Sequence, residues 1–328
     1  MAPRFPVSRP GVAGCPVAHP IWFILMTSPA SVDALQPPSW FPQALNTPAD
    51  LGATDVRGAT ITYRAWGERG QSGIVLVHGG AAHARWWDHI APLLAGGHRV
   101  AALDLSGHGD SDRRDSYNLD LWAEELLAVT AAAGIEGPPV VIGHSMGGFV
   151  TLRAASVYGS RLAGAVAIDS PVRDLTLEEQ AAREHRAFGP LRVYPSRQAA
   201  ISRFRPVPDQ PVLPYIASHV AGTSIRAVDG GWSWKFDPRI FSLDRPLSPL
   251  LTRMDCRVAL FRAEHGMVSP QMGEVMYDRL GRIAPVIEIP AAGHHVMLDQ
   301  PIALVTGIRT LLSDWDHSLP AEPRPALP

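Results

Sequence analysis

Residues 140–150 read VVIGHSMGGFV and decide the fold. The first three residues form a short apolar run that is typical of a strand buried on both faces. The run leads into Gly-x-Ser-x-Gly at 143–147, and a helical pattern follows. Glycines flank the serine because a sharp strand-to-helix turn leaves no room for side chains. We therefore predict that Ser145 projects from a strand end and faces the N-terminus of the next helix.

Apolar runs of the same kind recur on both sides of this turn. They lie at 73–78, 99–104, 139–142, 163–168, 257–261 and 285–289, with helical patterns at 119–133, 149–158 and 302–315. Residues 60–66 alternate between apolar and polar, as in an antiparallel strand. Buried strands that alternate with helices imply right-handed crossovers. The predicted fold class is therefore α/β, with a mostly parallel sheet flanked by helices.

The sheet pattern occupies two parts of the chain, 51–170 and 250–318. Residues 1–50 are rich in Pro, Ala and Ser without a sustained period, and predict an extended or disordered arm. An unstructured loop as long as 171–249 is improbable, so this segment is predicted to be a mainly helical cap inserted after the sixth strand. Residues 319–328 are predicted to be a tail.

The composition excludes several classes of protein. The net charge is −2 with no basic block, so neither nucleic acid nor an anionic membrane surface is expected as a partner. No apolar stretch reaches the length of about 20 residues that a membrane span needs. With Cys15 and Cys256 alone, a disulfide framework is excluded. This usage favours the cytoplasm, with secretion as the alternative, and a homodimer is compatible with the sequence.

Three further motifs accompany the serine turn. They are VHGG at 77–80, DLSGHGDSD at 104–112, and Gly-His at 293–294. With the turn itself, they occur in the order and at the spacing of the α/β-hydrolase superfamily, which residues 53–316 resemble. The resemblance implies an α/β-hydrolase core that carries a cap.

The resemblance also implies the roles of individual residues. Ser145 would be the nucleophile and His294 its general base. The backbone N–H groups of Gly80 and Met146 would form the oxyanion hole, which holds the negative charge of a tetrahedral intermediate. No cofactor is expected. His78, His83 and His89 lack a strong ligand spacing, so no metal site is predicted either.

The acid of the triad departs from the common pattern. Most members of the superfamily carry it in the loop after the seventh strand, where this chain has Gly266. Asp169 follows the sixth strand, at the place where haloalkane dehalogenases and zearalenone-type lactonases carry their acid. Glu264 is the other candidate. We favour Asp169 and keep Glu264 as the alternative.

These residues predict a serine hydrolase that cleaves a medium-sized apolar carboxylic ester or lactone through an acyl-enzyme on Ser145. Two alternatives stay open, a carbon–carbon bond hydrolase using the same serine and histidine, and a small-molecule receptor with little turnover. The side chains expected to line a mostly apolar substrate pocket are Trp86, Trp87, His144, Phe188, Trp232 and Trp234.

Overall fold

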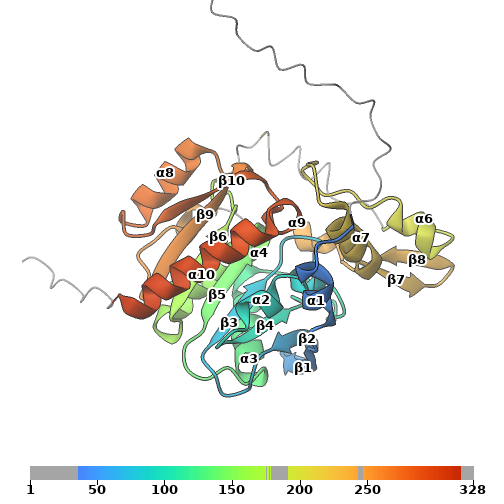
Figure 1. Ribbon diagram of the computed structural model, residues 1–328, viewed down its shortest axis with the longest axis horizontal. Helices are drawn as coiled ribbons and strands as arrows, with labels where there is room; N and C mark the ends of the chain where they lie inside the picture. Colours follow the sequence, from blue (N-terminus) through green and yellow to red (C-terminus); the bar gives the residue numbers. More distant parts are fainter. Residues whose placement is uncertain (1–35, 175, 177, 179–190, 243–246, 319–328) are drawn as a thin grey trace, which may run out of the picture. The chain divides into compact units, whose positions relative to one another are not determined.

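An eight-stranded sheet forms the centre of the computed structural model, which describes residues 36–174, 176, 178, 191–242 and 247–318. The strand order is β1-β2-β4-β3-β5-β6-β9-β10 (Figure 1). β2 pairs antiparallel with β1 and β4, and the other neighbours pair in parallel. The strands are β1 (Asp50–Val56), β2 (Ala59–Trp66), β3 (Gly73–Val77), β4 (Arg99–Leu103), β5 (Val140–His144), β6 (Gly164–Ile168), β9 (Arg257–His265) and β10 (Val286–Gly293). The predicted mostly parallel α/β sheet is confirmed.

Helices connect the strands, and Figure 1 shows α10 running across one side of the sheet. The core helices are α2 (Ala91–Leu94), α3 (Leu119–Ala132), α4 (Met146–Tyr158), α8 (Pro270–Arg279), α9 (Val296–Asp299) and α10 (Pro301–His317), with short 3₁₀ turns η1 (Ala84–Trp87) and η2 (Gly159–Arg161). Within the described ranges, no helix combines the length and the apolar character needed to cross a membrane.

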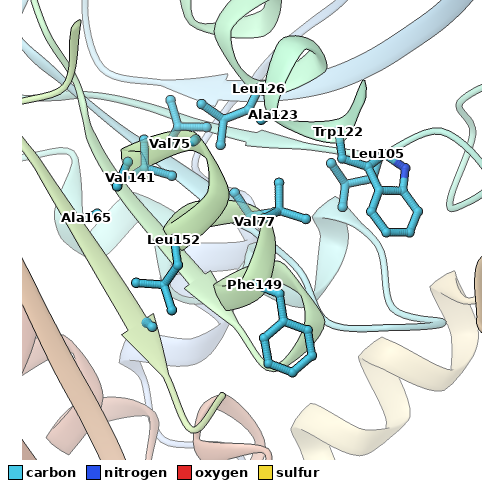
Figure 2. Packing of buried hydrophobic residues seen from close by; sticks show 14 of the residues in the cluster. Val75, Val77, Leu105, Trp122, Ala123, Leu126, Val141, Phe149, Leu152 and Ala165 are labelled. Atoms are coloured by element: carbon cyan, nitrogen blue, oxygen red, sulfur yellow. The ribbon is translucent and has the colours of Figure 1, made fainter. Parts of the chain in front are cut away.

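Both faces of the central strands are buried, which explains their unbroken apolar sequences. In β3, Val75 and Val77 belong to one hydrophobic cluster, whereas Ile74 and Leu76 belong to the other. Side chains alternate along a strand, so each face needs its own apolar set. Figure 2 shows Val75 and Val77 among side chains of α3 and α4, including Leu126. The resulting rigid sheet fixes the loops at its carboxyl edge.

In the described part of the segment predicted to be a cap, a two-stranded hairpin accompanies the helices, and the prediction did not include this hairpin. The elements of this segment are α6 (Arg197–Ile201), α7 (Pro214–Thr223), β7 (Ile225–Val228), β8 (Gly231–Trp234), η3 (Pro238–Phe241) and η4 (Ser248–Leu250). Of these, α6, α7, β7 and β8 lie together in Figure 1. Asp229 and Gly230 form the two-residue turn between β7 and β8, with Gly230 at φ 80°. Asp-Gly is a strong hairpin signal, and the sequence prediction overlooked it.

The segment before the sheet is partly ordered. Residues 40–46 form α1, which corrects the predicted extended or disordered arm for this stretch. Phe41 and Ala44 are buried at helical spacing, and the Phe41 ring centroid lies 4.8 Å from that of Tyr215. Burial of this apolar face stabilises a helix too short to form alone. Residues 1–35 and the tail at 319–328 lie outside the described residues.

Candidate active site

Ser145 occupies a strained turn between β5 and α4, with φ 54° and ψ −117°. Its N–H donates to Ile168 O at 2.9 Å, which ties the turn to β6. A Cβ at Gly143 would lie 2.1 Å from Gly147 O, and one at Gly147 would lie 2.4 Å from His78 O. Both flanking glycines are therefore required by close backbone approach, as the sequence predicted.

The His294 imidazole joins Ser145 to Asp169. His294 Nε2 lies 3.0 Å from Ser145 Oγ, and His294 Nδ1 lies 2.7 Å from Asp169 Oδ2. An ionised carboxylate only accepts hydrogen bonds, so Nδ1 carries the proton and Nε2 presents its lone pair to the serine hydroxyl. This is the tautomer that a general base needs.

The Asp169 carboxylate is buried but well supplied with donors. It accepts backbone N–H groups from Met267 at 2.7 Å and from Ala263 and Val268 at 3.2 Å each. Burial disfavours its charge, but the hydrogen bonds from His294 and Met267 N outweigh burial and hold the pKa of Asp169 below its ordinary value. The carboxylate therefore stays charged beside the imidazole at neutral pH.

Glu264, the alternative acid, has a different partner. Its Oε2 accepts the N–H of Ala291 at 2.7 Å, and the side chain is exposed at the end of β9. The structure thus places Asp169, and not Glu264, against His294 Nδ1.

Of the two residues predicted for the oxyanion hole, Met146 follows the serine directly and Gly80 lies beside the Met146 side chain. A Cβ at Gly79 would lie 3.3 Å from Ser145 Cβ, and one at Gly80 would lie 3.7 Å from Met146 Sδ. In α4, Gly148 N donates to Ser145 O at 3.0 Å. Met146 precedes this first bonded amide, so its N–H has no partner within the helix. Such a donor at a helix N-terminus suits a developing negative charge.

The loop that carries Gly79 and Gly80 is held by a neutral histidine. His78 Nε2 accepts the N–H of Leu105 at 3.1 Å, so its Nδ1 donates to Gly79 O at 2.8 Å. Burial lowers the pKa of His78, which keeps this pattern at neutral pH. Asp104 accepts the N–H of Ala84 at 2.6 Å from the same loop. These contacts give the motifs at 77–80 and 104–112 a structural role around the site.

Three aromatic rings lead from the histidine loop into the cap. The ring centroids of Trp86 and His295 are 5.5 Å apart, those of Trp86 and Phe204 are 6.1 Å apart, and those of Phe204 and Trp234 are 6.4 Å apart. Phe204 and Trp234 are partly exposed. This row of rings would suit an apolar substrate group.

Trp87, Trp232 and Phe188 were also predicted for the pocket. Trp87 is fully buried in the hydrophobic core between the sheet and α10. Trp232 pairs through its backbone with Tyr194, whose N–H donates to Trp232 O at 2.8 Å. Phe188 lies outside the described residues.

Two side chains near the site were missed at the sequence level. A Cβ at Gly80 would lie 3.0 Å from the Phe241 ring, so η3 places an aromatic ring against the loop that carries Gly80. Gln210 Oε1 accepts the N–H of His295 at 2.7 Å. Both residues come from the cap, where no motif marks them, and only tertiary contacts bring them to the site.

His144, His294 and His295 could together hold a metal ion, because one ligand atom of each lies within 4.8 Å of the others. His144 Nε2 bonds to His294 O at 2.8 Å, and His295 Nε2 bonds to Val207 O at 3.1 Å. These bonds place the proton of each ring on Nε2 and leave Nδ1 with a lone pair. Burial lowers the pKa of both rings, that of His295 to about 3, so neutral imidazoles are available as ligands.

Comparison with known proteins supports the family that these motifs resemble. The alpha/beta hydrolase family matches residues 74–307, which is more than half of the chain. The chain belongs to the alpha/beta hydrolase family. Among solved structures, E-2-(acetamidomethylene)succinate hydrolase superposes with a TM-score of 0.70 at 20% identity, covering 81% of this chain and 99% of the other. This likeness confirms the fold alone.

Individual relatives include named esterases. Esterase Rv0045c of Mycobacterium tuberculosis is 26% identical over 78% of this chain and 88% of its own length. A structure of that esterase, concerned with its transition metal inhibition, gives a TM-score of 0.65 at 24% identity, covering 84% of this chain and 96% of the other. Methylesterase 9 of Arabidopsis thaliana is 37% identical over 31% of this chain and 41% of its own length.

Proposed function

We propose that this alpha/beta hydrolase cleaves carboxylic esters through an acyl-enzyme on Ser145. The observation that carries the proposal is the single imidazole of His294, 3.0 Å from Ser145 Oγ and 2.7 Å from Asp169 Oδ2. The hydroxyl, the neutral imidazole and the buried carboxylate together form an activated serine nucleophile of the kind used in acyl transfer. The similarity to an esterase over most of both chains supports the same reaction.

In the first half of the reaction, Ser145 Oγ attacks the carbonyl carbon while His294 Nε2 takes the hydroxyl proton. The carbonyl oxygen becomes negative beside the N–H groups of Gly80 and Met146. His294 then gives its proton to the leaving alkoxide, the C–O bond breaks, and the alcohol departs. Asp169 stabilises the transient imidazolium and stays charged throughout.

In the second half, water replaces the serine as nucleophile. His294 takes a proton from this water, hydroxide adds to the acyl carbon, and the second tetrahedral intermediate collapses. The proton passes to Ser145 Oγ, and the carboxylic acid is released. General base catalysis of this kind contributes about 10²–10⁴-fold.

The proposed substrate is a medium-sized apolar ester or lactone. Trp86, Phe204 and Trp234 support this choice, because their rings extend from the histidine loop into the cap. Phe241 adds a ring beside Gly80. Aromatic walls favour apolar acyl or aryl groups over small polar ones.

We also propose that transition metals inhibit the reaction. The related esterase Rv0045c has been described with respect to such inhibition. In this chain, His144 and His295 present imidazoles next to His294. A metal that binds His294 Nε2 would remove the lone pair that the general base needs.

A panel of nitrophenyl esters and lactones of increasing acyl size tests the proposal. The wild type should hydrolyse medium apolar members best, and Ser145→Ala should be inactive. Asp169→Asn should lower kcat by about 10⁴-fold, whereas Glu264→Gln should retain wild-type rates. Turnover of a vinylogous diketone acid alone would favour the carbon–carbon bond hydrolase. Tight retention of a ligand without product would favour a receptor.

A further inference from the structure

The catalytic histidine lies on a short turn whose two flanking amides are held from outside the triad. Asp299 Oδ2, at the end of α9, accepts the N–H of Gly293 at 2.6 Å. Gln210 Oε1, from the cap, accepts the N–H of His295 at 2.7 Å. The peptide is thus fixed immediately before and immediately after His294.

One carboxamide links these two contacts. Gln210 Nε2 donates to Asp299 Oδ2 at 2.9 Å, while its Oε1 holds His295 N. The side chain at residue 210 must donate to Asp299 Oδ2 and accept from His295 N, and a neutral glutamine amide can do both. A Cβ at Gly293 would lie 2.8–3.0 Å from the Gln210 amide atoms, so the glycine before the catalytic histidine leaves room for this side chain.

The segment 207–213 around Gln210 contacts the chain just after the catalytic histidine, at His295 and at Leu298. Val207 O accepts His295 Nε2–H at 3.1 Å, and Leu213 N donates to Leu298 O at 2.9 Å. Gln210 lies between these two contacts in the sequence. The placement of the histidine loop therefore depends on how this cap segment is seated.

We propose that Gln210 is a positioning residue for His294, so that seating of the cap orients the catalytic imidazole. This inference rests on the proposed serine mechanism. The orientation of the His294 imidazole depends on the position of its peptide, because its hydrogen bonds to Ser145 Oγ and Asp169 Oδ2 are directional. A displacement of about 1 Å in such a geometry costs on the order of 10²-fold in rate.

A cavity of about 400 Å³ borders this contact, lined by residues that include Gln210, Asp299 and His265. Water can therefore reach the polar groups that a shorter side chain would leave unpaired. Because those groups would be hydrated, Gln210→Ala is expected to fold and to lose positioning rather than stability.

The experiment compares Gln210→Ala with Gln198→Ala, which removes an exposed glutamine from the same cap. Gln210→Ala should lower kcat by about 10–100-fold with KM within about two-fold, and the matched variant should change neither value.

The hydrogen-bonded Nδ1 proton of His294 gives a downfield NMR signal that needs no substrate. This signal should shift or broaden in Gln210→Ala and not in Gln198→Ala.

Gln210→Glu is a second variant, with a side chain of the same length. It keeps the acceptor for His295 N but replaces the Nε2 donor to Asp299 Oδ2 with a carboxylate. Its kcat should therefore fall as in Gln210→Ala, with a change in the same downfield signal.

Wild-type kcat and an unchanged downfield signal in Gln210→Ala and Gln210→Glu would overturn the proposal. If no ester is hydrolysed by the wild type, the proposed function fails, but the NMR comparison still decides whether Gln210 positions His294.

Discussion

The Asp169 carboxylate fills the space that a side chain at residue 266 would occupy. A Cβ built on Gly266 would lie 2.4 Å from both carboxylate oxygens of Asp169. Gly266 holds the place where most members of the superfamily carry the triad acid. The glycine at 266 and the acid at 169, just after β6, therefore depend on each other, because only one of the two positions can direct a carboxylate toward His294.

Gly266→Ala should accordingly disable the triad. The added methyl group must displace Asp169 or the loop whose amides hold it, and both changes move His294. We expect kcat for ester hydrolysis to fall by about 10² or more. Gly273→Ala is the matched control, because a Cβ there would meet Val286 at an ordinary 3.6 Å. Equal activities of the two variants would contradict this account of Gly266.

The acid should be transferable from one strand end to the other. Asp169→Gly alone removes the carboxylate and should reduce kcat by about 10⁴-fold. Adding Gly266→Asp places a carboxyl group in the space just vacated, so the double variant should recover part of the lost rate. Steady-state kinetics of the two variants test this, and a double variant no faster than Asp169→Gly would count against a shared site.

The sequence predicted most of the sheet and much of the site because buried parallel strands and tight turns leave strong local patterns. β3 to β6 are continuous apolar runs, and the serine turn needs its glycines for steric reasons. β1 was missed because its residues are mostly exposed and lack an apolar run, so they resemble a loop. The choice between Asp169 and Glu264 depended on contacts across strands, which local patterns do not contain.

Cap residues were the hardest to predict for the same reason. Gln210 and Phe241 reach the site through tertiary packing, and a lone glutamine or phenylalanine carries no motif. By contrast, the Asp229-Gly230 turn had a local signal that the periodicity of the neighbouring residues obscured.

The folded protein should lose stability as pH falls below about 6.5. Burial lowers the pKa of several histidines, which are His78, His83, His89, His108, His144 and His295. Below the unfolded value near 6.5, the unfolded chain binds more protons than the folded one, so acid favours unfolding by up to about 1.4 kcal/mol per pH unit for each histidine. Two carboxyl groups oppose this trend, because burial raises the pKa of Asp299 to about 6 and also raises the pKa of Glu125.

Thermal unfolding at pH 7, 6 and 5 measures the effect, and the Tm should fall at each step. His89→Gln is a useful variant, because its amide can still donate to Met297 O, which His89 Nε2 contacts at 2.8 Å. The pKa of His89 is lowered to about 4, so removing this histidine should make the free energy of unfolding depend less steeply on pH. The change in slope should correspond to roughly one bound proton. A Tm that stays constant or rises toward pH 5 would contradict this prediction.

Zinc, nickel or copper ions should inhibit ester hydrolysis, and a chelator should restore it. The imidazoles of His144, His294 and His295 provide nitrogen ligands that suit these ions. His295→Gln removes one ligand, so the metal concentration for half inhibition should rise by about ten-fold or more relative to that variant's own metal-free rate. Identical inhibition curves for wild type and His295→Gln would exclude this site.

Covalent labelling with a fluorophosphonate, followed by intact-mass and peptide analysis, tests the central claim most directly. The account predicts one phosphonyl adduct on Ser145, strongly slowed labelling in Asp169→Asn, and none in Ser145→Ala, with loss of esterase activity in step with labelling. A wild-type protein that hydrolyses esters while Ser145 stays unlabelled, or a Ser145→Ala variant with wild-type activity, would contradict it.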